Sequence, residues 1–90
     1  MPDEKLARAI HCRVRRNILS LLSKNPKLSV HHIAEKLKIT ESAASKNLKL
    51  LYYLGLIDSV DKPPEKFYYI KIEEVKQLLE GYNVVVKKMG

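Results

Sequence analysis

The sequence contains little of what builds disulfide frameworks or membrane spans. Cys12 is the only cysteine among 90 residues, so the chain cannot form an internal disulfide. No apolar run approaches the roughly 18 residues of a membrane-spanning helix. The first residues, 1–5, include the acidic Asp3 and Glu4 and no apolar segment follows them, which is unlike a secretory signal. We therefore expect a cytoplasmic protein that does not associate with membranes.

Acidic residues are also scarce relative to basic ones. The chain has 17 Lys and Arg against 10 Asp and Glu, which gives a formal net charge of +7. A charge of this size on a small body favours polyanionic partners, with nucleic acid ahead of an anionic membrane surface. The alternative that composition leaves open is a basic surface that serves only solubility.

Apolar residues at helical spacing are what the sequence has in quantity. A hydrophobic fraction of 46% is sufficient for one domain over residues 1–90. Spacings of three and four residues predict helices over about 3–10, 14–24, 30–38 and 41–53, with another over 73–82. Ser29 and Thr40 are typical N-caps for the third and fourth helices. Gly55 is typical of a residue that ends a helix in the left-handed conformation.

Between residues 56 and 72 the pattern changes from helical to extended. Residues 56–60 alternate loosely, and 67–72 are aromatic and β-branched, as strands are. The polar segment 61–66 contains two prolines and predicts an irregular loop, so 56–72 should form a hairpin. Residues 83–90 are interpreted as a tail or a frayed extension of the last helix. The expected fold is mainly α with a small β-hairpin (α+β), a winged helix-turn-helix in the order α-α-α-α-β-β-α.

The third and fourth helices, joined by a very short connection, predict the helix-turn-helix itself. Ile33, Ala34 and Leu37 on the first should pack against Ala44, Leu48 and Leu51 on the second, which leaves the other face of the second helix free for the major groove. Small side chains let the backbone approach the bases, while Ser, Asn and Lys can contact bases or phosphates. An ordinary amphipathic helix with a solvated face is the alternative. The residues expected to contact DNA are Thr40, Ser42, Ala43, Ser45, Lys46, Asn47 and Lys49.

Basic residues outside this helix supply weaker candidates. Lys62 and Lys66 lie at the expected wing tip, although the neighbouring Asp61 and Glu65 reduce their attraction for phosphate. A plain hairpin connection is the alternative there. Arg13, Arg15 and Arg16 form a basic cluster, of which Arg13 and Arg16 are candidates for the flanking DNA backbone. A solvated face or pairing with acids is the alternative for this cluster.

The chemistry-bearing residues do not assemble a catalytic pattern. No nucleophile–base pair and no carboxylate pair stands at catalytic spacing, so we expect neither an enzyme nor a cofactor. Neighbouring histidines such as His31 and His32 point about 100° apart on a helix, which makes shared ligation of one ion difficult. Cys12, beside Arg13, is interpreted either as a thiol switch with a lowered pKa or as a small half-buried side chain.

Four segments carry a recognisable pattern: residues 15–22, 28–37, 42–51 and 55–57. Together they resemble the ArsR-type winged-helix repressors. That family shows an Arg-x-x-Ile-Leu opening, a Val-x-x-Leu-Ala-x-x-Leu helix and a Ser-x-x-x-Ser-Arg/Lys-His-Leu-x-x-Leu recognition helix. The resemblance implies a homodimeric transcription regulator that binds double-stranded DNA at an inverted repeat, with the first and last helices at the dimer interface. The interface residues it implies are Leu6, Ile10, Val75, Leu78, Leu79 and Tyr82, for which closure of one chain's own core is the alternative.

Departures from the family pattern bear on sensing. Asn47 stands where the family has His, Val30-His31-His32 replaces the Cys-x-Cys pair of metal sensors, and residues 73–90 contain no His, Cys or Asp. We therefore expect a regulator with no metal effector. Two other functions remain open: a winged-helix module for protein–protein contact in a transcription assembly, and a non-specific nucleic-acid binder.

Overall fold

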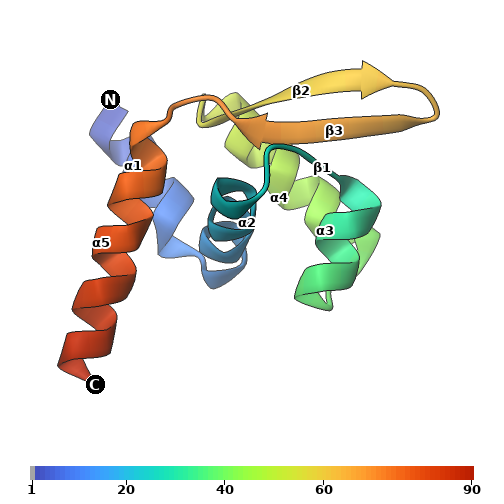
Figure 1. Ribbon diagram of the computed structural model, residues 1–90. Coiled ribbons are helices and arrows are strands. Elements are labelled where there is room, and N and C mark those ends of the chain that lie inside the picture. Colours follow the sequence, from blue (N-terminus) through green and yellow to red (C-terminus); the bar gives the residue numbers. More distant parts are fainter. Residues whose placement is uncertain (1) are drawn as a thin grey trace.

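The computed structural model describes residues 2–90, with the helices packed beneath a small antiparallel sheet (Figure 1). It has the winged helix-turn-helix fold expected from the sequence, mainly α with a hairpin that projects from the helical body. In chain order the elements are α1 (Pro2–His11), α2 (Arg13–Lys24), β1 (Leu28–Ser29), α3 (Val30–Leu37), α4 (Glu41–Tyr53), β2 (Ile57–Lys62), β3 (Glu65–Ile70) and α5 (Glu74–Met89).

Helix α2 is the centre of the core. It contacts α1, α3, α4, α5 and β3, and its Ile18, Leu19 and Leu22 are buried. Burying an aliphatic side chain of this size contributes about 1.5–3 kcal/mol, so this helix fixes the positions of the elements around it. None of the described helices has the length and apolar character needed to cross a membrane.

The helix ends follow the sequence signals. The Ser29 hydroxyl accepts a hydrogen bond from the His32 backbone N–H at 3.3 Å, and the Thr40 hydroxyl accepts from the Ala43 N–H at 3.0 Å. Both predicted N-caps are therefore confirmed. Gly55 follows α4 with φ of +85°, a conformation that glycine adopts without steric cost.

The short strand β1 was not expected from the sequence. It pairs antiparallel with β3, Leu28 opposite Tyr68 and Ser29 opposite Phe67, so the sheet has the order β1-β3-β2. Two residues are too few to show an alternating pattern, which is why the sequence gives no signal for this strand. The pairing ties the start of α3 directly to the wing.

Two predicted boundaries were wrong. Segment 61–66 is not irregular, because Asp61 pairs with Lys66 and Lys62 with Glu65, leaving only Pro63 and Pro64 in the turn. The last helix ends at Met89 instead of residue 82. Lys87 and Lys88 in its final turn favour this extension, since cations there interact well with the helix dipole.

Candidate nucleic-acid interface

Helices α3 and α4 pack through the apolar faces predicted for them. Ile33 and Ala34 of α3 are buried, as are Ala44, Leu48 and Leu51 of α4. Leu37 is partly buried against the same core. Because these contacts occupy one side of α4, the opposite side of the helix is left at the surface.

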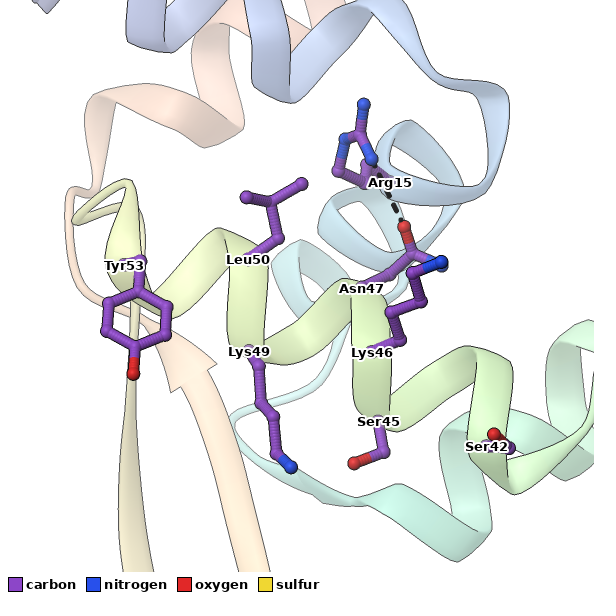
Figure 2. A pocket seen from close by; sticks show the side chains of 8 residues that line it. All are labelled: Arg15, Ser42, Ser45, Lys46, Asn47, Lys49, Leu50 and Tyr53. Carbon is purple, nitrogen blue, oxygen red and sulfur yellow. Dashed lines mark hydrogen bonds between the residues drawn. The ribbon is translucent and has the colours of Figure 1, made fainter.

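That outer side of α4 borders a shallow hollow, shown with its side chains in Figure 2. Among the predicted residues, Thr40, Ser42, Lys46 and Lys49 are exposed, while Ala43, Ser45 and Asn47 are half-buried. The hollow is lined by Arg15, Ser42, Ser45, Lys46, Asn47, Lys49, Leu50 and Tyr53. A short stretch of α4 thus presents two hydroxyls and two ammonium groups, which are donors that can reach bases and phosphates.

Asn47 differs from its expected role. Its Nδ2 donates to the Ala43 carbonyl at 2.9 Å, and its Oδ1 accepts from the Arg15 guanidinium at 3.3 Å. Both polar atoms therefore have partners within the chain, so the side chain offers less to a base edge than the sequence suggested. This contact could not be predicted from local sequence, because Arg15 lies 32 residues away.

Tyr53 belongs to the hollow but was missed by the sequence interpretation. Its side chain is 81% exposed. Tyr53 follows Ser42, Lys46 and Lys49 at spacings of four, three and four residues, which place all four on one helix face. That spacing could have identified it. The neighbouring Tyr52, one residue before the end of α4, is exposed as well.

The two lysines predicted at the wing lie on different faces of the sheet. Lys66 shares a cleft with Lys49 and Tyr53, between α4 and the sheet, and its Nζ lies 3.8 Å from an Asp61 carboxylate oxygen. Side chains alternate along a strand, so Lys62, in register with Glu65, lies on the other face. Of these two lysines, Lys66 therefore lies on the same side of the sheet as α4.

The two flanking arginine candidates have different environments. Arg13 is exposed at the start of α2. Arg16 instead turns toward the protein: it donates to the carbonyls of Ile10 and His11, and its guanidinium lies 5.0 Å from the centre of the Tyr82 ring. Arg16 was expected to contact the DNA backbone, but its donors are used to join α1, α2 and α5.

His31, in the first turn of α3, lies between the carboxylates of Glu35 on the same helix and Glu41 at the start of α4. Its Nδ1 is 3.4 Å from a Glu41 oxygen, and its Nε2 is 3.8 Å from a Glu35 oxygen. All three side chains are largely exposed. Across residues 2–90 the structure places no group of three or more His, Cys, Asp and Glu side chains where they could hold a metal ion.

Cys12 precedes the first turn of α2. The nearby backbone N–H of Arg15 lowers the pKa of the Cys12 thiol, and the Val14 N–H and the charges of Arg15 and Arg16 act in the same direction. Burial opposes this effect without reversing it. The thiol is partly accessible, so it combines accessibility with an enhanced thiolate fraction.

The residues predicted at a dimer interface fall into two groups. Val75 and Leu79 are buried within the chain, 4% and 3% exposed, so they offer little surface to a second copy. Leu78 is exposed, and it lines an apolar groove with the partly buried Leu6. Ile10 and Tyr82 are half-buried. Exposed apolar residues in and just before α5 that the prediction missed are Ile72, Val84, Val85, Val86 and Met89.

Sequence comparison places this arrangement in a family. Residues 12–59, from the start of α2 into β2, match the family described as bacterial regulatory protein, arsR family. The chain belongs to this family. No curated protein sequence matches the chain.

Solved structures agree with the family assignment of this ArsR-family chain. HlyU from Vibrio cholerae is 28% identical with a TM-score of 0.83, over 93% of this chain and 90% of that one. The homodimeric winged helix-turn-helix DNA-binding domain of Mb0332 from Mycobacterium bovis, a possible ArsR-family transcriptional regulator, is 26% identical with a TM-score of 0.86 over 98% and 81%. The transcriptional repressor BigR from Xylella fastidiosa, at 18% identity, shares the fold with a TM-score of 0.85 over 92% and 84%.

Proposed function

We propose that this ArsR-family chain is a transcriptional regulator that binds a specific double-stranded DNA sequence as a homodimer. The observation that carries the proposal is the outer face of α4. Leu48 and Leu51 on the inner face of α4 are buried in the core, whereas Lys46 and Lys49 project from the exposed side of the helix. A helix that is held rigidly and presents small polar and basic side chains fits the major groove.

The charges around α4 support contact with the phosphate backbone. Lys49 and Lys66 stand on either side of the cleft between α4 and the sheet, and Tyr52 and Tyr53 lie beside them. Tyrosine hydroxyls and lysine ammonium groups are common phosphate donors. We therefore expect the affinity for DNA to fall steeply as the salt concentration rises, since each neutralised phosphate releases counterions.

Helix α5 supports the homodimer. Its last two turns extend past the helical body (Figure 1), and Val85, Val86 and Met89 there are 56%, 52% and 82% exposed. These side chains continue the stripe that begins at Val75 and Leu79, so a second copy could bury what one chain leaves open. The Mb0332 domain, which is homodimeric, has the same fold over 98% of this chain.

Two symmetric recognition helices would enter successive major grooves, so the operator should be an inverted repeat. In-vitro selection of bound duplexes from a random pool tests this directly. We expect the full chain to enrich one half-site sequence in two inverted copies. Enrichment of no sequence, with binding that still depends on salt, would instead indicate a non-specific nucleic-acid binder. Absence of any binding would favour a protein–protein module.

Variants of α4 test which residues read the site. Lys46→Ala and Lys49→Ala should each weaken binding to the selected site by about tenfold, the loss typical of one charged contact. Lys24→Ala is a matched control, because this exposed lysine lies at a crevice between α2 and α5. If both α4 variants bind the selected site as tightly as the parent and the control, α4 is not the recognition helix.

We further propose that no metal ion acts as effector. Val30-His31-His32 occupies the place of the Cys-x-Cys pair found in metal-sensing members of the family, and the carboxylates nearest to His31 are two exposed glutamates on separate helices. Unfolding curves recorded with and without Zn²⁺ test this point. We expect the same midpoint and unchanged DNA affinity; a raised midpoint with altered affinity would contradict it.

A further inference from the structure

Two arginines of α2 donate hydrogen bonds to the carbonyls at the C-terminal end of α1. The last carbonyls of an α-helix have no partner within the helix and need donors from elsewhere. Arg15 Nε donates to the Arg8 carbonyl at 3.2 Å, and Arg16 donates to the carbonyls of Ile10 and His11. Positive charge at this end of a helix is also favourable for its dipole. The two guanidinium groups therefore fix α1 against α2.

Each of these arginines has a second contact on a more distant element. Arg16 stacks over Tyr82 of α5, at 5.0 Å from the ring centre. Arg15 donates through its Nη1 to Asn47 Oδ1 at 3.3 Å, as the dashed line in Figure 2 shows. The Asn47 amide is in turn held by the Ala43 carbonyl. A continuous polar path thus runs from the end of α1 through Arg15 to the middle of α4.

The hydrogen bonds of this path restrain the direction of α4, which apolar contacts restrain less. Leu48 and Leu51 bury α4 against its neighbours, but apolar contacts are non-directional and tolerate small rotations and slides of a helix. Hydrogen bonds weaken steeply when their angles change, and the guanidinium holds its donors in a fixed plane. The Arg15 contacts therefore add a directional link between α1 and α4 to the apolar packing of the core.

We propose that Arg15 is a positioning residue that sets the half-site spacing this protein recognises. The inference rests on the proposed function, in which a homodimer inserts α4 into the groove, and on the dimer interface of the first and last helices, α1 and α5, that the resemblance to ArsR-type repressors implies. The two α4 helices of a dimer must match grooves about 34–36 Å apart. Because Arg15 ties the interface helix to the recognition helix, loss of the bridge leaves the half-site contacts in place but loosens the distance between them.

The experiment measures the affinity of the full chain for the selected inverted repeat and for versions whose spacer is one or two base pairs longer or shorter. The parent should prefer one spacing strongly. Arg15→Ala and Arg15→Lys should each lose about tenfold on the preferred spacing and less than about twofold on the others, which flattens the preference. Thermal unfolding checks that both variants are folded.

The two substitutions separate positioning from simple charge. Lysine keeps the positive charge of Arg15 but cannot span the Arg8 carbonyl and Asn47 with one ammonium group. Arg13→Ala is the matched control, since it removes an exposed charge from the same helix and should lower affinity equally at all spacings. An Arg15→Lys variant with the parent's spacing preference, or an Arg13→Ala variant that flattens it equally, would overturn the proposal.

A double-mutant cycle tests the partner. If Asn47 acts through Arg15, the combined Arg15→Ala and Asn47→Ala variant should lose no more than the worse single variant; fully additive losses would overturn the bridge. Failure of the underlying function looks different. If the parent protein binds a single half-site but prefers no spacing, both the dimeric operator and this inference are wrong. If the parent prefers one spacing and the Arg15→Ala variant keeps that preference, this inference alone is wrong.

Discussion

The ammonium group of Lys27 lies 5.5 Å from the centre of the Phe67 ring, on the face of the sheet opposite the cleft that Lys66 shares with α4. The Lys62 ammonium, as a hydrogen-bond partner and as a like charge, lowers the pKa of Lys27. Lys27 and Lys62 are therefore held close together at the wing. Lys62 lies in the segment that was predicted to be a loop, and Lys27 in a segment for which no element was predicted.

Removal of Lys62 should raise the pKa of Lys27. A lysine whose pKa is lowered by folding is repelled in the folded state, and this repulsion is present below its pKa and disappears as the pH rises through it. Lys62→Ala should therefore move the Nζ titration of Lys27, followed by NMR, to higher pH. Lys66→Ala is the control, because Lys66 lies on the opposite face. An unchanged Lys27 titration in Lys62→Ala would contradict this arrangement.

The two N-caps of the helix-turn-helix should contribute measurably to stability. Thr40→Ala removes the acceptor for the Ala43 N–H and should lower the free energy of unfolding by about 1 kcal/mol. Ser29→Ala should cost at least as much, about 1–2 kcal/mol, because Ser29 is buried and would leave the His32 N–H unpaired.

Urea unfolding of the two variants provides the measurement. Thr40→Ser keeps the cap and should stay within about 0.5 kcal/mol of the parent, as should Ser42→Ala on the exposed side of α4. If Ser42→Ala destabilises as much as Thr40→Ala, the capping explanation fails.

The parts of the fold that the sequence predicted are those set by local chemistry. Ser29, Thr40 and Gly55 mark helix ends through their own side-chain or backbone properties, and the periodic leucines identify the faces that pack. The strand extension through Lys62 and Glu65 depends instead on pairing between two segments. No single segment contains that information, so the local composition of 61–66 was misleading.

The candidate site divides in the same way. Lys46 and Lys49 could be placed on the outer face of α4 from spacing alone, and both are exposed there. Arg16 and Asn47 could not, because their partners come from α1, α5 and α2. A long polar side chain contacts the groups that tertiary packing brings within its reach, so its role can be assigned only once the fold is known.

The Cys12 thiol should react faster than a free cysteine at moderate pH. Its pKa is lowered mainly by the nearby Arg15 backbone N–H, so the thiolate is favoured in the folded chain. The corresponding stabilisation is present above the unfolded-state pKa and is lost as the pH falls through the folded-state pKa.

Alkylation rates measured against pH test this expectation. The midpoint for the folded protein should lie below the midpoint measured in urea, where the helix is absent. Cys12→Ser, which should not be labelled, confirms that the signal comes from this residue. Equal midpoints in the two states, or a higher one when folded, would contradict the assigned cause.

The exposed stripe of α5 predicts where a single charge should break the dimer. Leu78 and Val85 are 40% and 56% exposed and lie beside the buried Val75 and Leu79 on one side of the helix. An aspartate at either position places a charge in the expected interface without entering the core of one chain, and a buried unpaired charge is strongly unfavourable. Leu78→Asp and Val85→Asp should therefore shift the protein to monomer in sedimentation experiments.

Val84→Asp is the matched control for this test. Val84 is 51% exposed, close to Val85, but nine residues from Val75 it points about 180° away from the stripe at 3.6 residues per turn. The control should stay dimeric and keep full affinity for the inverted repeat, while the two stripe variants should retain only the weaker affinity for a single half-site. If Val84→Asp dissociates the protein and Val85→Asp does not, the dimer uses another face of α5, and the interface on which the spacing role of Arg15 rests is wrong.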